Sequence, residues 1–140
     1  MNHAWVVDAS VAGALLLADE HNEKAAALLS ATLASDGRWH VPALWWYEVD
    51  NLLLSTVRRK RMRREQVSEA WSLVADFPLA TDVGLQHPPA AVKIFDVAAA
   101  TGLSAYDAAY AELALRLQCG LATLDAPLRK AAKKLGLRVW

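Results

Sequence analysis

The stretch WVVDASVAGALLL, residues 5–17, is a run of apolar residues that a single carboxylate, Asp8, interrupts. The residues before Asp8 are aromatic or β-branched and predict a short buried strand over residues 4–7, whereas those after it predict a helix over residues 10–17. A carboxylate at such a junction either caps the following helix or takes part in chemistry. The stretch therefore predicts a strand that carries one acid at its carboxyl end.

Outward from this stretch, short apolar segments alternate with helical patterns along the whole chain. Further strands are predicted at residues 39–42, 79–81, 121–123 and 137–140. Further helices are predicted at residues 22–33, 42–61, 64–77, 89–100, 104–118 and 127–135, and residues 82–91 predict a loop that leads into a helix with proline in its first turn. Short apolar strands separated by helices indicate an α/β fold with a parallel sheet covered on both faces.

The composition limits the classes of protein that the chain can represent. Its 140 residues fit one domain, residues 1–140, and a formal net charge of zero excludes a polycation that coats nucleic acid through bulk charge. No apolar run is long enough to span a membrane, and the start of the chain lacks a signal-peptide pattern. Cys119 is the only cysteine, so no intrachain disulfide forms. We expect a cytoplasmic protein without membrane contact.

A second acid, Glu48, lies on the helix predicted at residues 42–61. Its neighbours one turn away on either side, Leu44 and Leu52, are apolar, so Glu48 lies beside the buried stripe of the helix. Asn51 shares that side. A half-buried carboxylate needs a partner, whereas a glutamate at the edge of a helix reaches solvent, and the helix alone leaves both alternatives open.

Two more acids stand near the starts of predicted helices. Asp107 follows Ser104 by three residues, which resembles a capping box with aspartate in place of the usual Glu or Gln. Asp125 lies between a predicted strand and a helix with Pro127 in its first turn, a natural N-cap position. Each acid alone is explained by capping.

The acids taken together indicate a metal site. Asp8 and Asp125 both follow predicted strands, and the carboxyl ends of parallel strands lie at one edge of a sheet. Crowded carboxylates repel one another unless a cation lies between them, and Mg²⁺ or Mn²⁺ prefers oxygen ligands. Ser10 and Thr123 lie two residues from these acids and either add hydroxyl groups to the site or cap turns. We therefore expect a divalent cation, Mg²⁺ or Mn²⁺, at this edge.

Four segments together resemble a known family. VVDASV, WWYEVDNLL, GLSAYDAAYAELAL and LATLDAPLRKAAKKLGL occur in the order and spacing of PIN domains, and most closely resemble the VapC-type ribonuclease toxins of bacterial toxin–antitoxin pairs. The resemblance spans residues 4–139. It implies a single PIN domain, built as a three-layer α/β/α sandwich around the parallel sheet.

The resemblance also implies roles for particular residues. The catalytic and metal-binding quartet is Asp8, Glu48, Asp107 and Asp125, with Asp8 and Asp107 as the chief ligands. The accessory residues that orient the acids are Ser10, Asn51 and Thr123. The implied activity is hydrolysis of RNA phosphodiester bonds through a Mg²⁺-bound water. The implied partners are RNA, a second copy of the chain, and an antitoxin that blocks the acidic site.

RNA binding requires positive charge, and RRKRMRR, residues 58–64, is the densest basic run in the chain. We take Arg58, Arg59 and Arg61 as candidate RNA-binding residues beside the acids. The alternative is a solvated helix end, because cations favour a helix C-terminus. A second basic cluster on the last predicted helix offers the same charge, at Arg129, Lys130, Lys133 and Lys134.

Other α/β enzymes fit the sequence less well. Haloacid-dehalogenase-like phosphatases need a second aspartate two residues after the first, where this chain has Ser10. Receiver domains need an acidic pair near the first strand, which is absent. Two alternatives within the resemblance stay open: a PIN-domain nuclease that processes RNA and is no toxin, and a non-catalytic dimerising regulator.

Overall fold

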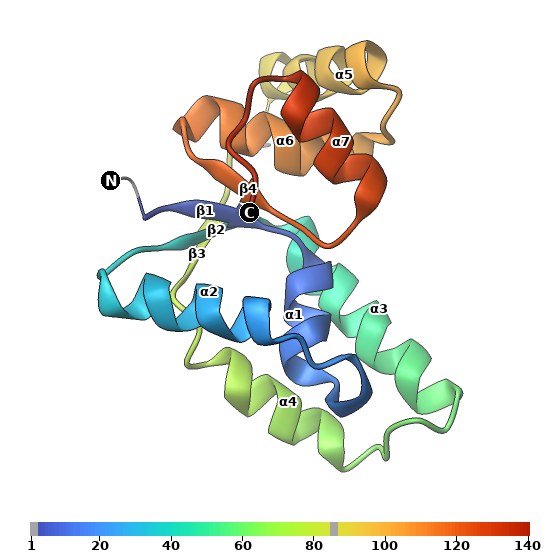
Figure 1. The fold of residues 1–140 in the computed structure, drawn as a ribbon. Coiled ribbons are helices and arrows are strands. Elements are labelled where there is room, and N and C mark those ends of the chain that lie inside the picture. The colour runs from blue at the N-terminus through green and yellow to red at the C-terminus, as the bar shows by residue number, and fades with distance from the viewer. Residues whose placement is uncertain (1–2, 85–86) are drawn as a thin grey trace.

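A computed structural model describes residues 3–84 and 87–140 (Figure 1). In this part of the chain, a parallel sheet has the strand order β3-β2-β1-β4. Its strands are β1 (Trp5–Val7), β2 (Trp39–Pro42), β3 (Leu79–Asp82) and β4 (Gly120–Ala122). The prediction of an α/β fold around a parallel sheet is confirmed. The predicted strand at residues 137–140 is wrong, because only Val139 forms a bridge, to Leu121 beside the edge of the sheet.

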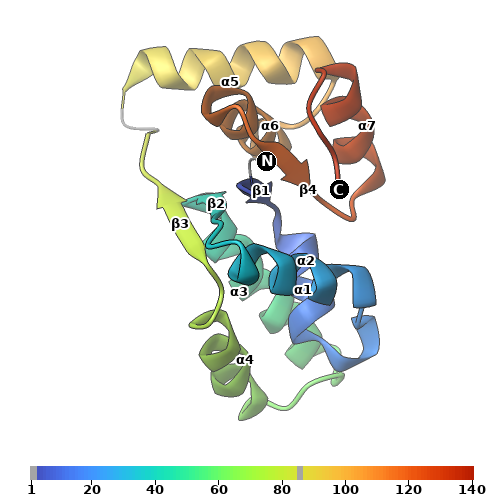
Figure 2. The same cartoon turned by 60° about the vertical axis from the view of Figure 1, so that its left-hand side comes forward.

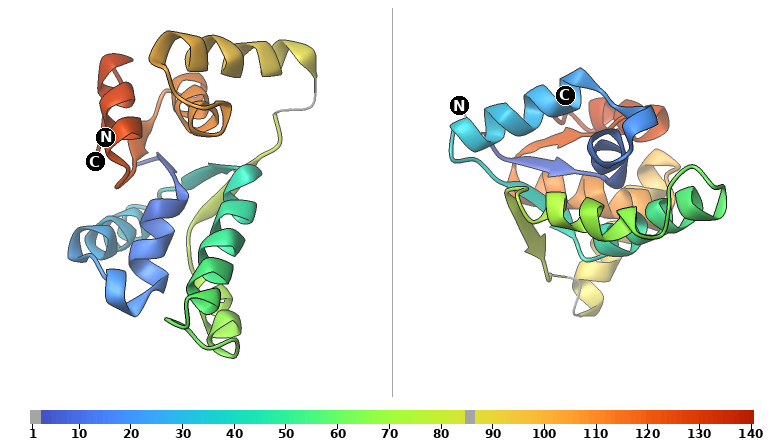
Figure 3. Two further views of the ribbon diagram at one scale, coloured as in Figure 1. Left: turned by 90° about the vertical axis from the view of Figure 1, so that its right-hand side faces the viewer. Right: turned by 90° about the horizontal axis from the view of Figure 1, so that it is seen from below.

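Helices lie on both sides of the sheet, as expected for a three-layer sandwich (Figures 1 and 2). On one side are α1 (Ala9–Leu16), α2 (Glu23–Ala34), α3 (Leu44–Arg58) and α4 (Gln66–Val74), with a short 3-10 turn η1 (Ala18–Glu20) after α1. On the other are α5 (Pro88–Thr101), α6 (Ala105–Leu117) and α7 (Ala126–Lys134). Figure 3 shows the same two groups from further directions. Among the described residues, no helix is long and apolar enough to cross a membrane.

The predicted helices are confirmed, with shorter ends in two cases. The helix predicted at residues 42–61 spans Leu44–Arg58, and the one predicted at residues 64–77 spans Gln66–Val74. Prolines occupy the first turn of α5, as predicted from residues 82–91. Residues 85–86 of that predicted loop lie outside the described residues.

The central strand β1 is buried on both faces, because α6 covers one face and α1 with α2 covers the other (Figure 1). Val6 and Val7 are both fully buried, in two separate apolar clusters. The cluster around Val6 contains Trp45 of α3 and Leu113 of α6, so it joins elements from both helical layers. The segment that carries Asp8 is therefore fixed from both sides.

A glycine brings α1 close to α3. A Cβ atom at Gly13 would lie 2.9 Å from Cδ1 of Leu52, closer than carbon atoms pack without a shift. Glycine at this position therefore allows the two helices to approach. This contact sets the distance between the start of α1, which follows Asp8, and the helix that carries Glu48.

The topology defines one edge of the sheet as the place for a ligand. The chain runs outward from β1 to β2 and β3 and then returns to the other side of β1 as β4, so the strand order reverses between β1 and β4. Ligands of open parallel sheets bind outside the carboxyl ends of the strands at such a reversal. Val7 pairs with Ala122, so Asp8 and Thr123 follow neighbouring strands at that point.

Candidate acidic site at the sheet edge

Asp8 is a buried carboxylate at the end of β1, with hydrogen-bond donors on both oxygens. Its Oδ1 accepts from the Ser10 hydroxyl at 2.5 Å and from the Ser10 amide at 3.2 Å, and its Oδ2 accepts from the Thr123 hydroxyl at 2.6 Å. The bond from the Ser10 amide makes Asp8 the N-cap of α1. Burial nevertheless raises the pKa of Asp8 to about 6, against the opposing effect of these hydrogen bonds.

The two hydroxyl groups also hold the loop after β4 against Asp8. The Leu124 amide donates to Ser10 Oγ at 2.9 Å, and the Asp125 amide donates to Thr123 Oγ1 at 2.9 Å. Thr123 is fully buried. Ser10 and Thr123 therefore fix the Asp8 carboxylate and connect it to the segment that carries Asp125, which is the orienting role expected from the sequence.

Glu48 of α3 is half-buried and has a protein partner. The Tyr110 hydroxyl of α6 donates a hydrogen bond to Glu48 Oε1. Burial raises the pKa of Glu48 and the negative charge of Asp107 raises it further, while the Tyr110 hydrogen bond opposes both. Of the two alternatives left by the sequence, the partnered carboxylate is the one observed. Sequence reasoning did not single out Tyr110, although it lies one helical turn after Asp107.

Asp107 and Asp125 stand at helix starts, as expected from capping. The Asp107 amide donates to Ser104 Oγ at 3.1 Å, and Asp125 Oδ2 accepts from the Leu128 amide at 2.9 Å. Burial raises the pKa of the Asp107 carboxyl, and the negative charge of Asp125 raises it further. Capping and electrostatic coupling therefore occur together at these residues.

Electrostatic interactions link Glu48, Asp107 and Asp125 directly, and link Asp8 to them only through Tyr110. Asp107 is coupled to Glu48 and to Asp125, and the pKa of Tyr110 is raised by burial, by Glu48 and by the charges of Asp8 and Asp107. None of the ion pairs within residues 3–84 and 87–140 includes any of the four acids. The sheet edge thus gathers negative charge that no side-chain cation neutralises.

The donor chemistry of this site fits a hard divalent cation. Carboxylate and hydroxyl oxygens are the ligands that Mg²⁺ prefers, and a cation would relieve the repulsion that raises the pKa of Asp107. In the described part of the chain, however, no three His, Cys, Asp or Glu side chains are close enough to form a ready-made metal cluster. A cation would therefore have to draw the acids closer together.

The basic run after α3 divides into two parts. Arg61 forms ion pairs with Asp19 and Glu20 of the turn η1. Arg58 and Arg59 are exposed and line an open groove of about 430 Å³ on α3, together with Asn51. Asn51, predicted to orient the acids, thus borders this groove. The two exposed arginines lie at the far end of α3, roughly 15 Å along the helix from Glu48.

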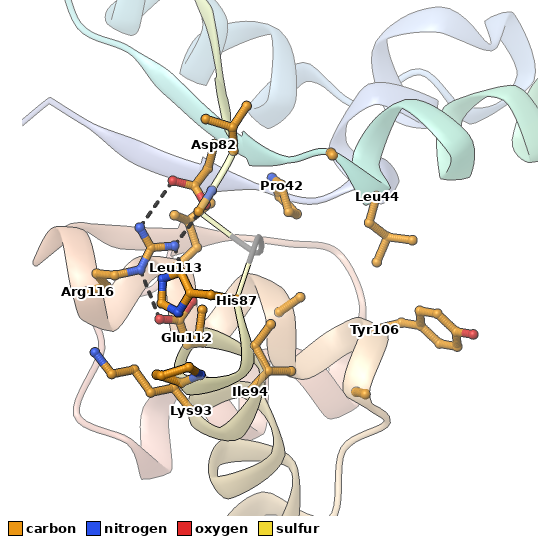
Figure 4. Close-up of a pocket in the computed structure, with 17 residues that line it drawn as sticks. Pro42, Leu44, Asp82, His87, Lys93, Ile94, Tyr106, Glu112, Leu113 and Arg116 are labelled. Atoms are coloured by element: carbon orange, nitrogen blue, oxygen red, sulfur yellow. Dashed lines mark hydrogen bonds and ion pairs between the residues drawn. The ribbon is translucent and has the colours of Figure 1, made fainter.

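A cavity lies next to the acids, and none of the four acids lines it (Figure 4). It has a volume of about 630 Å³ and lies between the ends of β2 and β3 and helices α5 and α6. Leu44, one turn before Glu48, and Tyr106, directly before Asp107, both line it. This cavity could not be predicted from the sequence, because its walls come from four separate segments.

Comparisons with known proteins agree with this geometry. The profile of the PIN domain family matches residues 5–134. The chain is 34% identical over 125 residues to Ribonuclease VapC3 of Pyrobaculum aerophilum, which covers 88% of this chain and 90% of that protein. The crystal structure of PAE2754 from Pyrobaculum aerophilum is similar with a TM-score of 0.70 and 25% identity, over 97% of this chain and 83% of that one.

Proposed function

The chain belongs to the PIN domain family, and from this membership we propose that it is a metal-dependent endoribonuclease that acts as the toxin of a toxin–antitoxin pair. The observation that carries the proposal is the buried Asp8 carboxylate at the point where the strand order reverses, together with Asp107, whose charge acts on Glu48 and on which the charge of Asp125 acts. The similarity to a protein named ribonuclease supports RNA as the substrate. We propose that it works in the cytoplasm.

In this proposal Asp8 and Asp107 are the chief ligands of Mg²⁺, with Mn²⁺ as a substitute, and Glu48 and Asp125 complete the site. The bound cation would supply an activated water and neutralise charge on the phosphate. Ser10 and Thr123 hold the Asp8 carboxylate in one orientation through hydrogen bonds to both of its oxygens. Tyr110 holds one oxygen of Glu48, Oε1, through a hydrogen bond, so the cation would have to bring together acids that are each already fixed within their own segment.

The test is cleavage of single-stranded RNA by the purified protein, with the ends of the products mapped. We expect a 5′-phosphate and a 3′-hydroxyl, because the attacking water comes from the metal site and the ribose 2′-hydroxyl is not needed as a nucleophile. A 2′,3′-cyclic phosphate would contradict the proposal, since it arises only when the 2′-hydroxyl attacks.

We further propose that Arg58 and Arg59 bind RNA phosphates at the far end of α3 from Glu48. The Arg58→Glu/Arg59→Glu variant reverses both charges and should weaken RNA binding. The plot of log association constant against log salt concentration should become less steep by about two, or about one for each lost phosphate contact. Fluorescence anisotropy with a labelled RNA in EDTA, at several salt concentrations, measures both effects without cleavage.

Arg61→Glu is the matched control for this prediction, because it lies in the same basic run but is already paired with Asp19 and Glu20. We expect it to leave the salt slope close to that of the unmodified protein. Equal effects of the control and the double variant would mean that the run acts only through its total charge.

The toxin assignment also includes a homodimer and an antitoxin that covers the acidic site. Expression of the chain alone should stop cell growth, and co-expression of the cognate antitoxin should restore it. Growth without arrest, combined with RNA cleavage in vitro, would favour the alternative of a PIN-domain nuclease that processes RNA.

A further inference from the structure

The cavity beside the acidic site is a candidate for a second part of the same site (Figure 4). Its walls are mainly apolar and include Pro42, Leu44, Ile94 and Leu113. Its volume of about 630 Å³ lies within the range of pockets that bind small molecules, roughly 300–1,000 Å³. A mostly apolar pocket with a few fixed polar groups is the usual form of such a site.

Two helices connect the cavity directly to the acids. On α6, Ala105, Tyr106 and Ala109 line the cavity. Asp107, in the same helical turn, is one of the four acids of the site. On α3, Leu44 lines the cavity and Glu48 follows one turn later. The cavity therefore lies within about one helix diameter, roughly 10 Å, of the acidic site.

One end of the cavity presents a rigid polar group. Arg116 of α6 donates hydrogen bonds to both oxygens of Asp82, at 3.1 and 2.9 Å, and to both oxygens of Glu112, at 2.9 and 3.3 Å. These bonds hold the guanidinium group in place. A fixed guanidinium offers a flat surface on which a planar ring can stack.

The charges that line the cavity balance one another. Asp82 and Glu112 carry negative charge, while Arg116 and Lys93 carry positive charge. A phosphate group would find no excess positive charge here, unlike at the groove of Arg58 and Arg59. An uncharged, flat and partly apolar group suits the cavity better.

We propose that this cavity binds one base of the RNA strand, next to the bond that is cleaved, with Tyr106 at its mouth stacking on that base. This inference rests on the proposed ribonuclease function. Tyr106 is 67% exposed and lines the cavity. Bases of single-stranded RNA are commonly turned out of the strand and stacked on aromatic rings or on arginine.

A consequence is a preference for single-stranded RNA and for particular bases at one position beside the cut. A base inside a duplex is stacked and paired, so it does not enter a cavity without disrupting the helix. Discrimination between bases would come from the hydrogen-bonding groups of the Asp82–Arg116–Glu112 network at the end of the cavity.

The test fills the cavity from a helix that contributes nothing to the acids. Ile94→Trp on α5 should occupy part of the volume, raise KM for single-stranded RNA at least about tenfold and weaken the base preference, with a smaller effect on kcat. Phe95→Trp is the matched control, since Phe95 is the next residue on α5, is 69% exposed and does not line the cavity. Circular dichroism confirms that both variants are folded.

A second pair of variants examines the stacking group. Tyr106→Ala should raise KM about fivefold to a hundredfold, the equivalent of one lost base–aromatic contact, and Tyr106→Phe should restore it because the ring is kept. The preferred base is identified by cleavage of oligonucleotides that differ at each position around the cut.

The outcomes separate this inference from the proposed function. If the unmodified protein does not cleave RNA, the proposed function fails. If it cleaves RNA and Ile94→Trp has the KM and base preference of the control, the cavity is not a base site and the inference fails alone. Loss of antitoxin binding by Ile94→Trp with unchanged RNA kinetics would also overturn it, and would assign the cavity to a protein partner.

Discussion

The Asp8→Asn variant is expected to cleave RNA at least about a hundredfold more slowly than the unmodified protein, and to remain folded. Asp8 is the most buried of the four acids at the sheet edge and has both oxygens fixed by hydroxyl donors. Asparagine has nearly the same shape but lacks the negative charge that a cation requires. The measurement is the rate of cleavage of a labelled RNA with saturating Mg²⁺.

The same substitution should not destabilise the fold. Asparagine is as good an N-cap as aspartate, and the Thr123 hydroxyl can rotate to accept a hydrogen bond from the new amide. Burial raises the pKa of Asp8 from its ordinary 3.8 to about 6, so ionised Asp8 lowers the free energy of unfolding. Removal of the charge should therefore raise the free energy of unfolding at pH 7 by up to about 3 kcal/mol.

The pH dependence gives this effect a definite sign. Because the folded protein holds the Asp8 proton more tightly than the unfolded chain, the stabilising effect of that proton is complete below about pH 4 and is lost as the pH rises through about 6. Without metal, the free energy of unfolding should fall more between pH 4 and pH 7.5 for the unmodified protein than for Asp8→Asn, as measured by thermal unfolding. Asp50→Asn, at an exposed position of α3, controls for loss of charge in general. Full activity of Asp8→Asn would contradict the assignment of the site.

Removal of divalent cations is expected to have an effect of similar size. EDTA should reduce RNA cleavage at least about a hundredfold, and Mg²⁺ or Mn²⁺ should restore it. The physical reason is that negatively charged carboxylates repel a phosphate group unless a cation lies between the acids and the phosphate. Cleavage that continues unchanged in EDTA would exclude the metal-dependent mechanism.

Cation binding should also be visible without RNA. At a free Mg²⁺ concentration of about 100 times Kd, binding adds about 2.7 kcal/mol to the free energy of unfolding, which a thermal shift detects. Asp107→Asn should lose most of this shift, whereas Asp96→Asn, an exposed residue of α5, should keep it. A shift that is equal in both variants would place the cation elsewhere.

The parts of the site that follow from strand order could be predicted from the sequence. Asp8 and Asp125 were predicted at one edge because both follow predicted strands, and the structure pairs the ends of these strands, Val7 with Ala122. Capping at Ser104 and Asp125 was predicted for a different reason: a helix cap depends only on neighbours within a few residues.

Features that depend on distant partners could not be predicted. Glu48 and Tyr110 are 62 residues apart, and nothing in either segment indicates that they form a hydrogen bond. Arg61 carries the same charge as Arg58, and only the folded chain pairs it with Asp19 and Glu20. The metal ion, the RNA and the assembly of the chain remain proposals for the same reason.

The predicted strand at residues 137–140 shows how a short pattern misleads. Alternating apolar residues over four positions are typical of a strand, yet the segment pairs with the sheet only at Val139. Two backbone hydrogen bonds make this bridge, from the Leu121 amide to the Arg138 carbonyl at 2.8 Å and from the Trp140 amide to the Leu121 carbonyl at 3.3 Å. The carbonyl of Trp140 accepts a hydrogen bond from the Arg129 side chain of α7.

The double role of two aspartates, as helix caps and as acids of the site, has an evolutionary consequence. Asp8 caps α1 and Asp125 caps α7, and asparagine or serine serves a helix start equally well. Under the proposed mechanism, one such substitution at either position would end RNA cleavage and leave the helix cap in place. Relatives with such a substitution would keep their helices and lose the proposed nuclease activity. A shared fold therefore does not indicate which relatives cleave RNA.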